Sequence, residues 1–164
     1  MSLNILCVDS DSSYFLIPGL TLWTKEQDAF NFSGHSPVIA HPPCPQWSRL
    51  RHFANYNLKE KVLAEWCWDI VNANGGIFEH PAGSSFFRYV GADMKKVFSV
   101  DQCWWGFPAR KRTYLYFHRC SHIPFPLFNL PTVKQLNEIP PHLRSRSPLA
   151  FNQWLVDCVK ETWK

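Results

Sequence analysis

The fold is decided by residues 37–46, which read PVIAHPPCPQ. The first four residues form a short apolar run, which is typical of a buried strand. Pro42 and Pro43 then end the strand, because each proline fixes φ and removes a backbone donor. The sequence therefore presents Cys44 on a rigid turn after a buried strand, where α/β proteins bind their ligands. Cys44 is either a nucleophile or a small buried thiol without reactivity.

A helix and a second strand follow this turn. Apolar residues recur at helical spacing through residues 58–73, and residues 76–79 predict the next strand. Residues 37–80 therefore form a βαβ unit, whose crossover should be right-handed over a parallel sheet. Cys44 and the pair Glu79-His80 are expected at one edge of that sheet, because both follow the carboxyl ends of neighbouring strands.

The rest of the chain predicts a single α/β domain over residues 1–164. The 164 residues, 46% of them hydrophobic, are enough for one well-packed core. Ser147 is expected to cap the last helix, with Pro148 in its first turn. The further strands are expected at residues 3–9, 20–23, 99–103 and 113–117. We expect a mostly parallel sheet with helices on both faces.

Composition favours a protein of the cytoplasm. No apolar run reaches the length of a membrane-spanning helix, and the first residues do not resemble a signal peptide. The six cysteines show no CxxC spacing, so we predict neither a disulfide framework nor a metal site. The formal net charge of +4 permits a nucleic-acid partner without requiring one.

Three motifs in this order resemble motifs of the DNA cytosine-C5 methyltransferases. They are Pro42-Pro43-Cys44, Glu79-His80-Pro81, and a segment from Gln102 to Arg110-Lys111-Arg112. The resemblance covers about residues 37–117, and small phage and prophage proteins look similar to the whole chain. It therefore implies the cytoplasm of a bacterial or phage-infected host cell. It implies a reduced Rossmann-like, methyltransferase-type sheet. It also implies DNA as partner, either single-stranded or with a pyrimidine flipped out of the duplex.

The resemblance assigns a role to each motif. In that family the cysteine attacks C6 of the pyrimidine, so Cys44 would be the nucleophile. Glu79 would be the acid at the N3/N4 edge of the ring, and Arg110 and Arg112 would contact O2 or a phosphate. Arginine beside the cysteine would lower the pKa of the thiol, and alternation along a strand places both arginines on one side with Lys111 opposite. Further substrate contacts are expected from Pro43, Gln46, Arg49 and His80.

The sequence also departs from the family. AdoMet is the methyl donor that the resemblance implies, and its site begins with a glycine-rich turn after the first strand. Here that turn reads Ser10-Asp11-Ser12-Ser13, without glycine. Asp28 is the residue that would stand where an acidic side chain contacts the cofactor. His80 replaces the usual asparagine, and only residues 118–147 occupy the place of the target-recognition region, so a homodimer or a partner subunit would have to supply target recognition.

Three functions therefore stay open. The first is covalent pyrimidine chemistry of the cytosine-C5 methyltransferase type, in a phage-type DNA-modification protein. The second is a non-catalytic DNA-binding or anti-restriction module that keeps the base pocket. The third is an enzyme that needs no AdoMet because its pyrimidine already carries a group at C5. The missing glycines favour pyrimidine recognition over methyl transfer.

Overall fold

The computed structural model describes residues 2–48, 52, 55–126 and 134–164. It contains one six-stranded sheet with the order β2-β1-β3-β4-β6-β5. The first four strands in this order are parallel, whereas β6 runs antiparallel to both of its neighbours. The predicted mostly parallel α/β sheet is therefore confirmed. Its strands are β1 (Leu3–Val8), β2 (Leu20–Thr24), β3 (Val38–Ala40), β4 (Gly76–Pro81), β5 (Val97–Asp101) and β6 (Arg112–His118).

The predicted βαβ unit consists of β3, helix α1 (Leu58–Asn74) and β4. Two glycines make the return from α1 into the sheet. Gly75 ends the helix with a φ of 86°, and Gly76 follows with a φ of 124°. A Cβ on Gly76 would lie 1.8 Å from the carbonyl oxygen of Val38, so a side chain there would separate β4 from β3.

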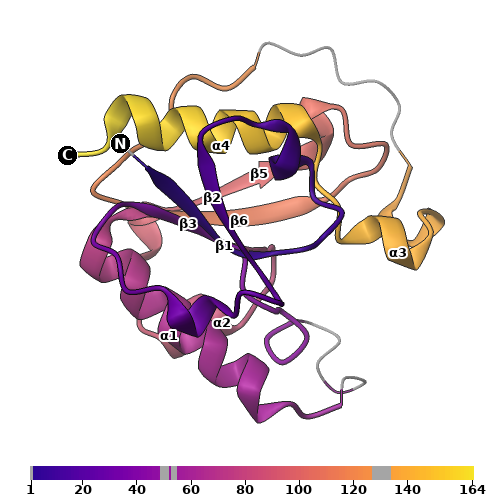
Figure 1. Cartoon of the computed structure of the whole chain (residues 1–164). Coiled ribbons are helices and arrows are strands. Elements are labelled where there is room, and N and C mark those ends of the chain that lie inside the picture. Colours follow the sequence, from indigo (N-terminus) through magenta and orange to yellow (C-terminus); the bar gives the residue numbers. More distant parts are fainter. Residues whose placement is uncertain (1, 49–51, 53–54, 127–133) are drawn as a thin grey trace.

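Helices cover both faces of the sheet, as Figure 1 shows. Helices α1 and α2 (Phe86–Tyr89) lie on one face and helix α4 (Leu149–Thr162) on the other. Alternation along β3 produces the two cores, because Val38 and Ala40 pack with α1 whereas Ile39 packs with α4. The remaining elements are short: α3 (Pro141–Arg144) and the 3₁₀ helices η1 (Ser13–Leu16), η2 (Ala29–Asn31), η4 (Met94–Lys96), η5 (Gln102–Trp105) and η6 (Leu136–Glu138).

Two local predictions were wrong at the ends of elements. Residues 102 and 103 lie in η5 and not in a strand, because Asp101 accepts a hydrogen bond from the Cys103 N–H and starts a turn. The last helix begins at Leu149 with Pro148 as its N-cap, and Ser147 does not cap it. The Ser147 hydroxyl lies instead 3.5 Å from the Lys111 amine.

The order of the strands positions the functional site. Strands β1 and β3 are neighbours in the sheet. The connection after β1 leads to β2 on one side, whereas the connection after β3 leads to β4 on the other. Such a switch point opens a crevice outside the carboxyl ends of the strands. Among the described residues, no helix is both long and apolar enough to cross a membrane.

Candidate functional site

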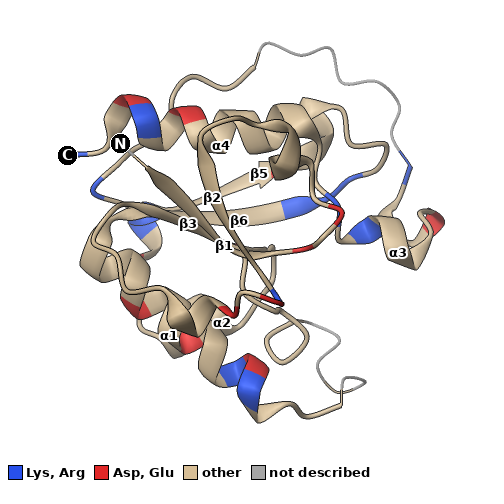
Figure 2. Cartoon of the chain, in the orientation of Figure 1, with Lys and Arg blue, Asp and Glu red and all other residues tan. Residues whose placement is uncertain are grey.

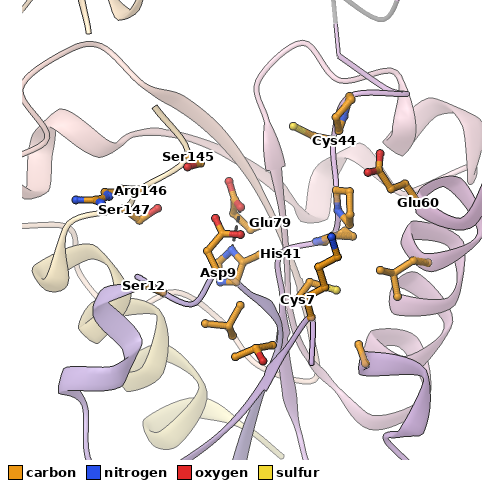
Figure 3. A pocket seen from close by; sticks show the side chains of 18 of the residues that line it. Cys7, Asp9, Ser12, His41, Cys44, Glu60, Glu79, Ser145, Arg146 and Ser147 are labelled. Carbon is orange, nitrogen blue, oxygen red and sulfur yellow. Dashed lines mark hydrogen bonds and ion pairs between the residues drawn. The ribbon is translucent and has the colours of Figure 1, made fainter. Parts of the chain in front are cut away.

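A cavity of about 680 Å³ lies at this carboxyl edge. The ends of β1 and β2, the turn after β3, the end of β4 and the residue before β6 all contribute to its lining. Strand β6 can contribute its amino end because it runs antiparallel to β4. Figure 3 shows Cys44, Glu79, His41 and Asp9 around this cavity. The cavity therefore brings together residues from all three predicted motifs, which are far apart in the sequence.

Cys44 is a free cysteine that lines the cavity and is partly buried. Burial raises the pKa of the Cys44 thiol to about 11, with a further rise from the negative charge of Glu79. Lys111 lowers the pKa, but its effect is smaller. The expectation of a depressed pKa for Cys44 is therefore wrong. Cys44 is a protonated thiol at neutral pH, and a reaction at its sulfur needs a base.

Glu79 is the carboxylate of the site. Burial alone would raise the pKa of Glu79, but the hydrogen bond from His41, the charge of the His41 ring when it is protonated, and the positive charge of Lys111 hold it below its ordinary value. The bond joins His41 Nδ1 to Glu79 Oε2 over 2.9 Å, and it is the dashed line of Figure 3. On the other side of the ring, His41 Nε2 lies 2.9 Å from the hydroxyl of Tyr14. Glu79 is thus an anion at the end of a hydrogen-bonded series that runs from Tyr14 through His41.

Lys111 is the basic residue of the third motif that lines the cavity, whereas Arg110 and Arg112 were the residues predicted to contact the substrate. The predicted alternation holds, but it turns Lys111 to the cavity and leaves the two arginines exposed outside its lining. The Arg110 backbone N–H donates to the carbonyl of Lys134, which fixes the chain just before β6. The Lys111 amine donates to the carbonyls of Ser145 and Arg146, at 3.3 and 2.7 Å.

The other predicted substrate contacts divide into two groups. Pro43 lines the cavity beside Cys44. Gln46 lies outside this lining, and its amide donates to the carbonyl of Asn55. His80 is fully buried with Nδ1 2.7 Å from the Ser84 hydroxyl, and burial lowers its pKa to about 4. His80 therefore supports the chain after β4 as a neutral ring and does not face the cavity. Arg49 lies outside the described residues.

The opposite side of the cavity is acidic and polar. Asp9, Asp11 and Ser12 follow β1, and Asp28 follows β2. The Asp28 carboxylate caps η2 and lies 3.3 Å from the Lys59 amine. Ser12 caps the 3₁₀ helix η1, and the Asp11 carboxylate lies 2.6 Å from the Arg146 guanidinium. Side chains that make these contacts stand after β1, where the resemblance implies a glycine turn for AdoMet.

Sequence reasoning missed three residues of the site: Lys111, His41 and Tyr14. His41 carried a weak signal, because it directly precedes the Pro-Pro turn at the end of a strand. Tyr14 carried none. Among the described residues, no group of three or more histidine, cysteine or acidic side chains could hold a metal ion. Comparison of the chain with protein-family models and with curated proteins found no match.

Proposed function

We propose that this chain is a DNA-modification protein that binds a pyrimidine base in the cavity and reacts with it through Cys44. One observation carries the proposal. A thiol, a carboxylate and an ammonium group from three separate strand ends, Cys44, Glu79 and Lys111, line one cavity at the switch point of the sheet. These are the kinds of group that nucleophilic addition to a pyrimidine ring requires.

The chemistry begins with a proton. Cys44 must lose its proton before sulfur can attack, and Glu79 is the carboxylate whose charge acts on it. In the proposed step the thiol proton passes to Glu79, and the thiolate forms a bond to C6. The π electrons of the ring shift from C5=C6 toward C4 and N3. Glu79 then gives the proton to N3, which leaves an enamine with a nucleophilic C5.

Lys111 supplies the positive charge during this step. Its pKa is lowered by burial, while the charge of Glu79 acts in the opposite direction. An ammonium group beside the ring stabilises the thiolate and the charge that develops on the pyrimidine. Lys111 takes the place that the resemblance gave to arginine, although it can offer only a point charge and not a planar fork of donors.

A second function, that of a non-catalytic base-binding or anti-restriction module, is favoured by the state of Cys44. The thiol is protonated at neutral pH, and Ser12 and Asp11 have other contacts in the turn where the resemblance would put the methyl donor. A module of this kind would bind single-stranded or flipped pyrimidine DNA in the same cavity without forming a bond to it. An AdoMet-independent enzyme on C5-substituted pyrimidines would use the same Cys44 addition.

Covalent trapping distinguishes these functions. Single-stranded oligonucleotides that contain 5-azacytosine are incubated with the protein. Addition of the sulfur at C6 places an electron pair on N5 of this base. A proton then binds N5, and the sulfur stays bonded to C6. We expect an adduct by denaturing electrophoresis and mass spectrometry, absent with Cys44→Ala. Oligonucleotides with 5-fluorocytosine, with and without AdoMet, test methyl transfer separately. Binding of the oligonucleotide without any adduct would support the non-catalytic module, and absence of binding would contradict both functions.

A further inference from the structure

The contacts of His41 extend the site beyond the residues that resemble the methyltransferases. His41 follows β3 and precedes the turn that carries Cys44, and both of its ring nitrogens have partners. Its side chain is 16% exposed and that of Glu79 is 15% exposed. The imidazole thus joins η1, through Tyr14, to the end of β4, through Glu79, from a position three residues before the thiol.

Hydrogen-bond chemistry fixes which atom donates and which accepts in the two bonds of His41. An ionised carboxylate can only accept, so His41 Nδ1 must donate to Glu79. Whenever the ring is neutral, Nε2 is therefore the acceptor, and the Tyr14 hydroxyl donates to it. Burial and the charge of Glu79 raise the pKa of Tyr14, so the phenol keeps its proton and remains a donor. Tyr14 therefore selects the tautomer of His41 that bonds to Glu79.

From this geometry we propose that His41 is a positioning residue: it holds one oxygen of Glu79 through Nδ1–H, with Tyr14 fixing the tautomer, so that only Oε1 of Glu79 exchanges protons with Cys44 and the base. The inference rests on the proposed function for its catalytic meaning. The hydrogen bond itself has consequences for the titration of Glu79 that can be measured without any substrate.

Several charged groups act on the same carboxylate and must be held constant in the test. Burial pushes the pKa of Glu79 upward, and the bond from His41 is the strongest of the opposing influences. Loss of this bond therefore raises the pKa of Glu79. The other titratable and charged groups that act on Glu79, or on which its charge acts, are Tyr14 on η1, Cys44 after β3, His80 on β4 and Lys111 before β6.

Two isosteric substitutions separate the two bonds of His41. The amide nitrogen of asparagine occupies the position of Nδ1, so His41→Asn keeps a donor for Glu79 and loses the contact with Tyr14. Glutamine reaches the position of Nε2, so His41→Gln keeps the contact with Tyr14 and loses the donor. Tyr14→Phe removes only the outer hydroxyl. Tyr89→Phe is the matched control, because the exposed Tyr89 hydroxyl donates to Glu65.

The first measurement is a carboxyl ¹³C NMR titration of glutamate-labelled protein, with the Glu79 signal assigned by its absence in Glu79→Gln. We expect the pKa of Glu79 to rise in His41→Gln, to rise less in Tyr14→Phe, and to stay near the wild-type value in His41→Asn and Tyr89→Phe. An unchanged titration in His41→Gln, or an equal rise in His41→Asn, would overturn the inference. Circular dichroism verifies folding, and Tyr14→Phe decides the question if the His41 variants unfold.

The second measurement links the bond to the reaction. The rate of adduct formation with 5-azacytosine DNA is followed from pH 5 to pH 9. His41→Gln should lose on the order of tenfold in rate, since a misplaced catalytic group typically costs this much or more. The fall of the rate at low pH should also begin at a higher pH, because the pKa of Glu79 is raised. If wild-type protein forms no adduct, the proposed function fails while the NMR titration still decides the role of His41. If adducts form and His41→Gln has the wild-type pH profile, the positioning role fails alone.

Discussion

The two sides of the cavity are built differently. The thiol side, made of His41, Pro43, Cys44, Glu79 and Lys111, joins the ends of β3, β4 and β6 through buried or half-buried contacts. The acidic side, made of Asp9, Asp11, Ser12 and Asp28, follows β1 and β2 and contacts Lys59 and Arg146 through exposed side chains. Figure 2 marks basic residues at the start of β6 and acidic residues in the loop after β1.

Because of this difference, similar charges interact with different energies on the two sides of the cavity. An exposed ion pair, such as that of Asp28 with Lys59, contributes about 0–1 kcal/mol because water screens it. Charges removed from water act on one another more strongly, and the pKa of Glu79 is lowered by its partners even though burial raises it. Substitutions on the thiol side should therefore change the chemistry, whereas those on the acidic side should be tolerated.

The largest expected effect belongs to Glu79→Gln. An amide cannot carry the thiol proton to N3, so adduct formation with 5-azacytosine DNA should slow by about 10²–10⁴-fold, the usual contribution of a general acid or base. The same substitution removes a negative charge from Cys44 and should lower the pKa of its thiol. Alkylation of Cys44 by iodoacetamide at pH 8 should thus become faster. Slower trapping with faster alkylation is the combined result that we expect.

Asp9→Asn is the control for this experiment. Asp9 is an exposed carboxylate on the acidic side of the same cavity. Both rates should stay near the wild-type values. An equal loss of trapping in Asp9→Asn would mean that the two sides of the cavity do not differ in function.

Acid should lower the free energy of unfolding, because the buried His80 ring binds a proton less readily in the folded state than in the unfolded state. The unfolded chain binds a proton there with a pKa near 6.5, whereas the buried ring in the fold has a pKa of about 4. Between these values the unfolded state holds more protons, so the free energy of unfolding decreases as the pH falls from 6.5 to about 4. The full loss is roughly 3 kcal/mol, at about 1.36 kcal/mol for each pH unit.

Urea unfolding at several pH values between 7 and 4.5 measures this loss. His80→Asn keeps a polar group beside Ser84 and cannot titrate, so its stability should depend less on pH in this window. The contribution of Glu79 is lost at lower pH, because its folded pKa lies below 4.5. Equal pH dependence in wild type and His80→Asn would show that the buried ring is not the source.

Lys111→Met should have a smaller effect on stability. It removes the donor that holds the carbonyls of Ser145 and Arg146, and hydrogen bonds of this kind contribute about 1–2 kcal/mol in net terms. The substitution should also raise the pKa of Cys44, because a nearby positive charge is lost. Urea unfolding and iodoacetamide alkylation measure the two effects. Lys160→Met, at an exposed position on α4, should change neither of them.

The fold and the edge that carries the site were predictable because their signals are local. The prolines after Ala40 and the apolar spacing of residues 58–73 identify strand, turn and helix without knowledge of the rest of the chain. Parallel pairing then places Cys44 and Glu79 at one edge by geometry alone. The structure confirms this βαβ unit and both of its strands.

The positions of Lys111 and of the hydrogen-bonded residues Tyr14, His41 and Glu79 were not predictable, because they depend on pairing between distant segments. Alternation shows that Lys111 is opposite Arg110 and Arg112, but only the insertion of the antiparallel β6 beside β4 shows which side faces the cavity. Tyr14 and His41 are 27 residues apart, and no local pattern joins a 3₁₀ helix to the end of a strand. Pairwise contacts of this kind arise from the packing of the whole sheet.

The smallest effect is expected for Asp28→Asn on the acidic side. Asparagine tolerates the positive φ of 51° at this position and can still accept the hydrogen bond from the Phe30 N–H. The exposed contact with Lys59 is lost, so the free energy of unfolding should fall by less than about 0.5 kcal/mol, and 5-azacytosine trapping should not change. Calorimetry with AdoMet should show no saturable binding to either protein. If AdoMet instead binds saturably and Asp28→Asn weakens the binding, the acidic side is a cofactor site. The Asp28 carboxylate would then contribute to ligand binding and little to stability.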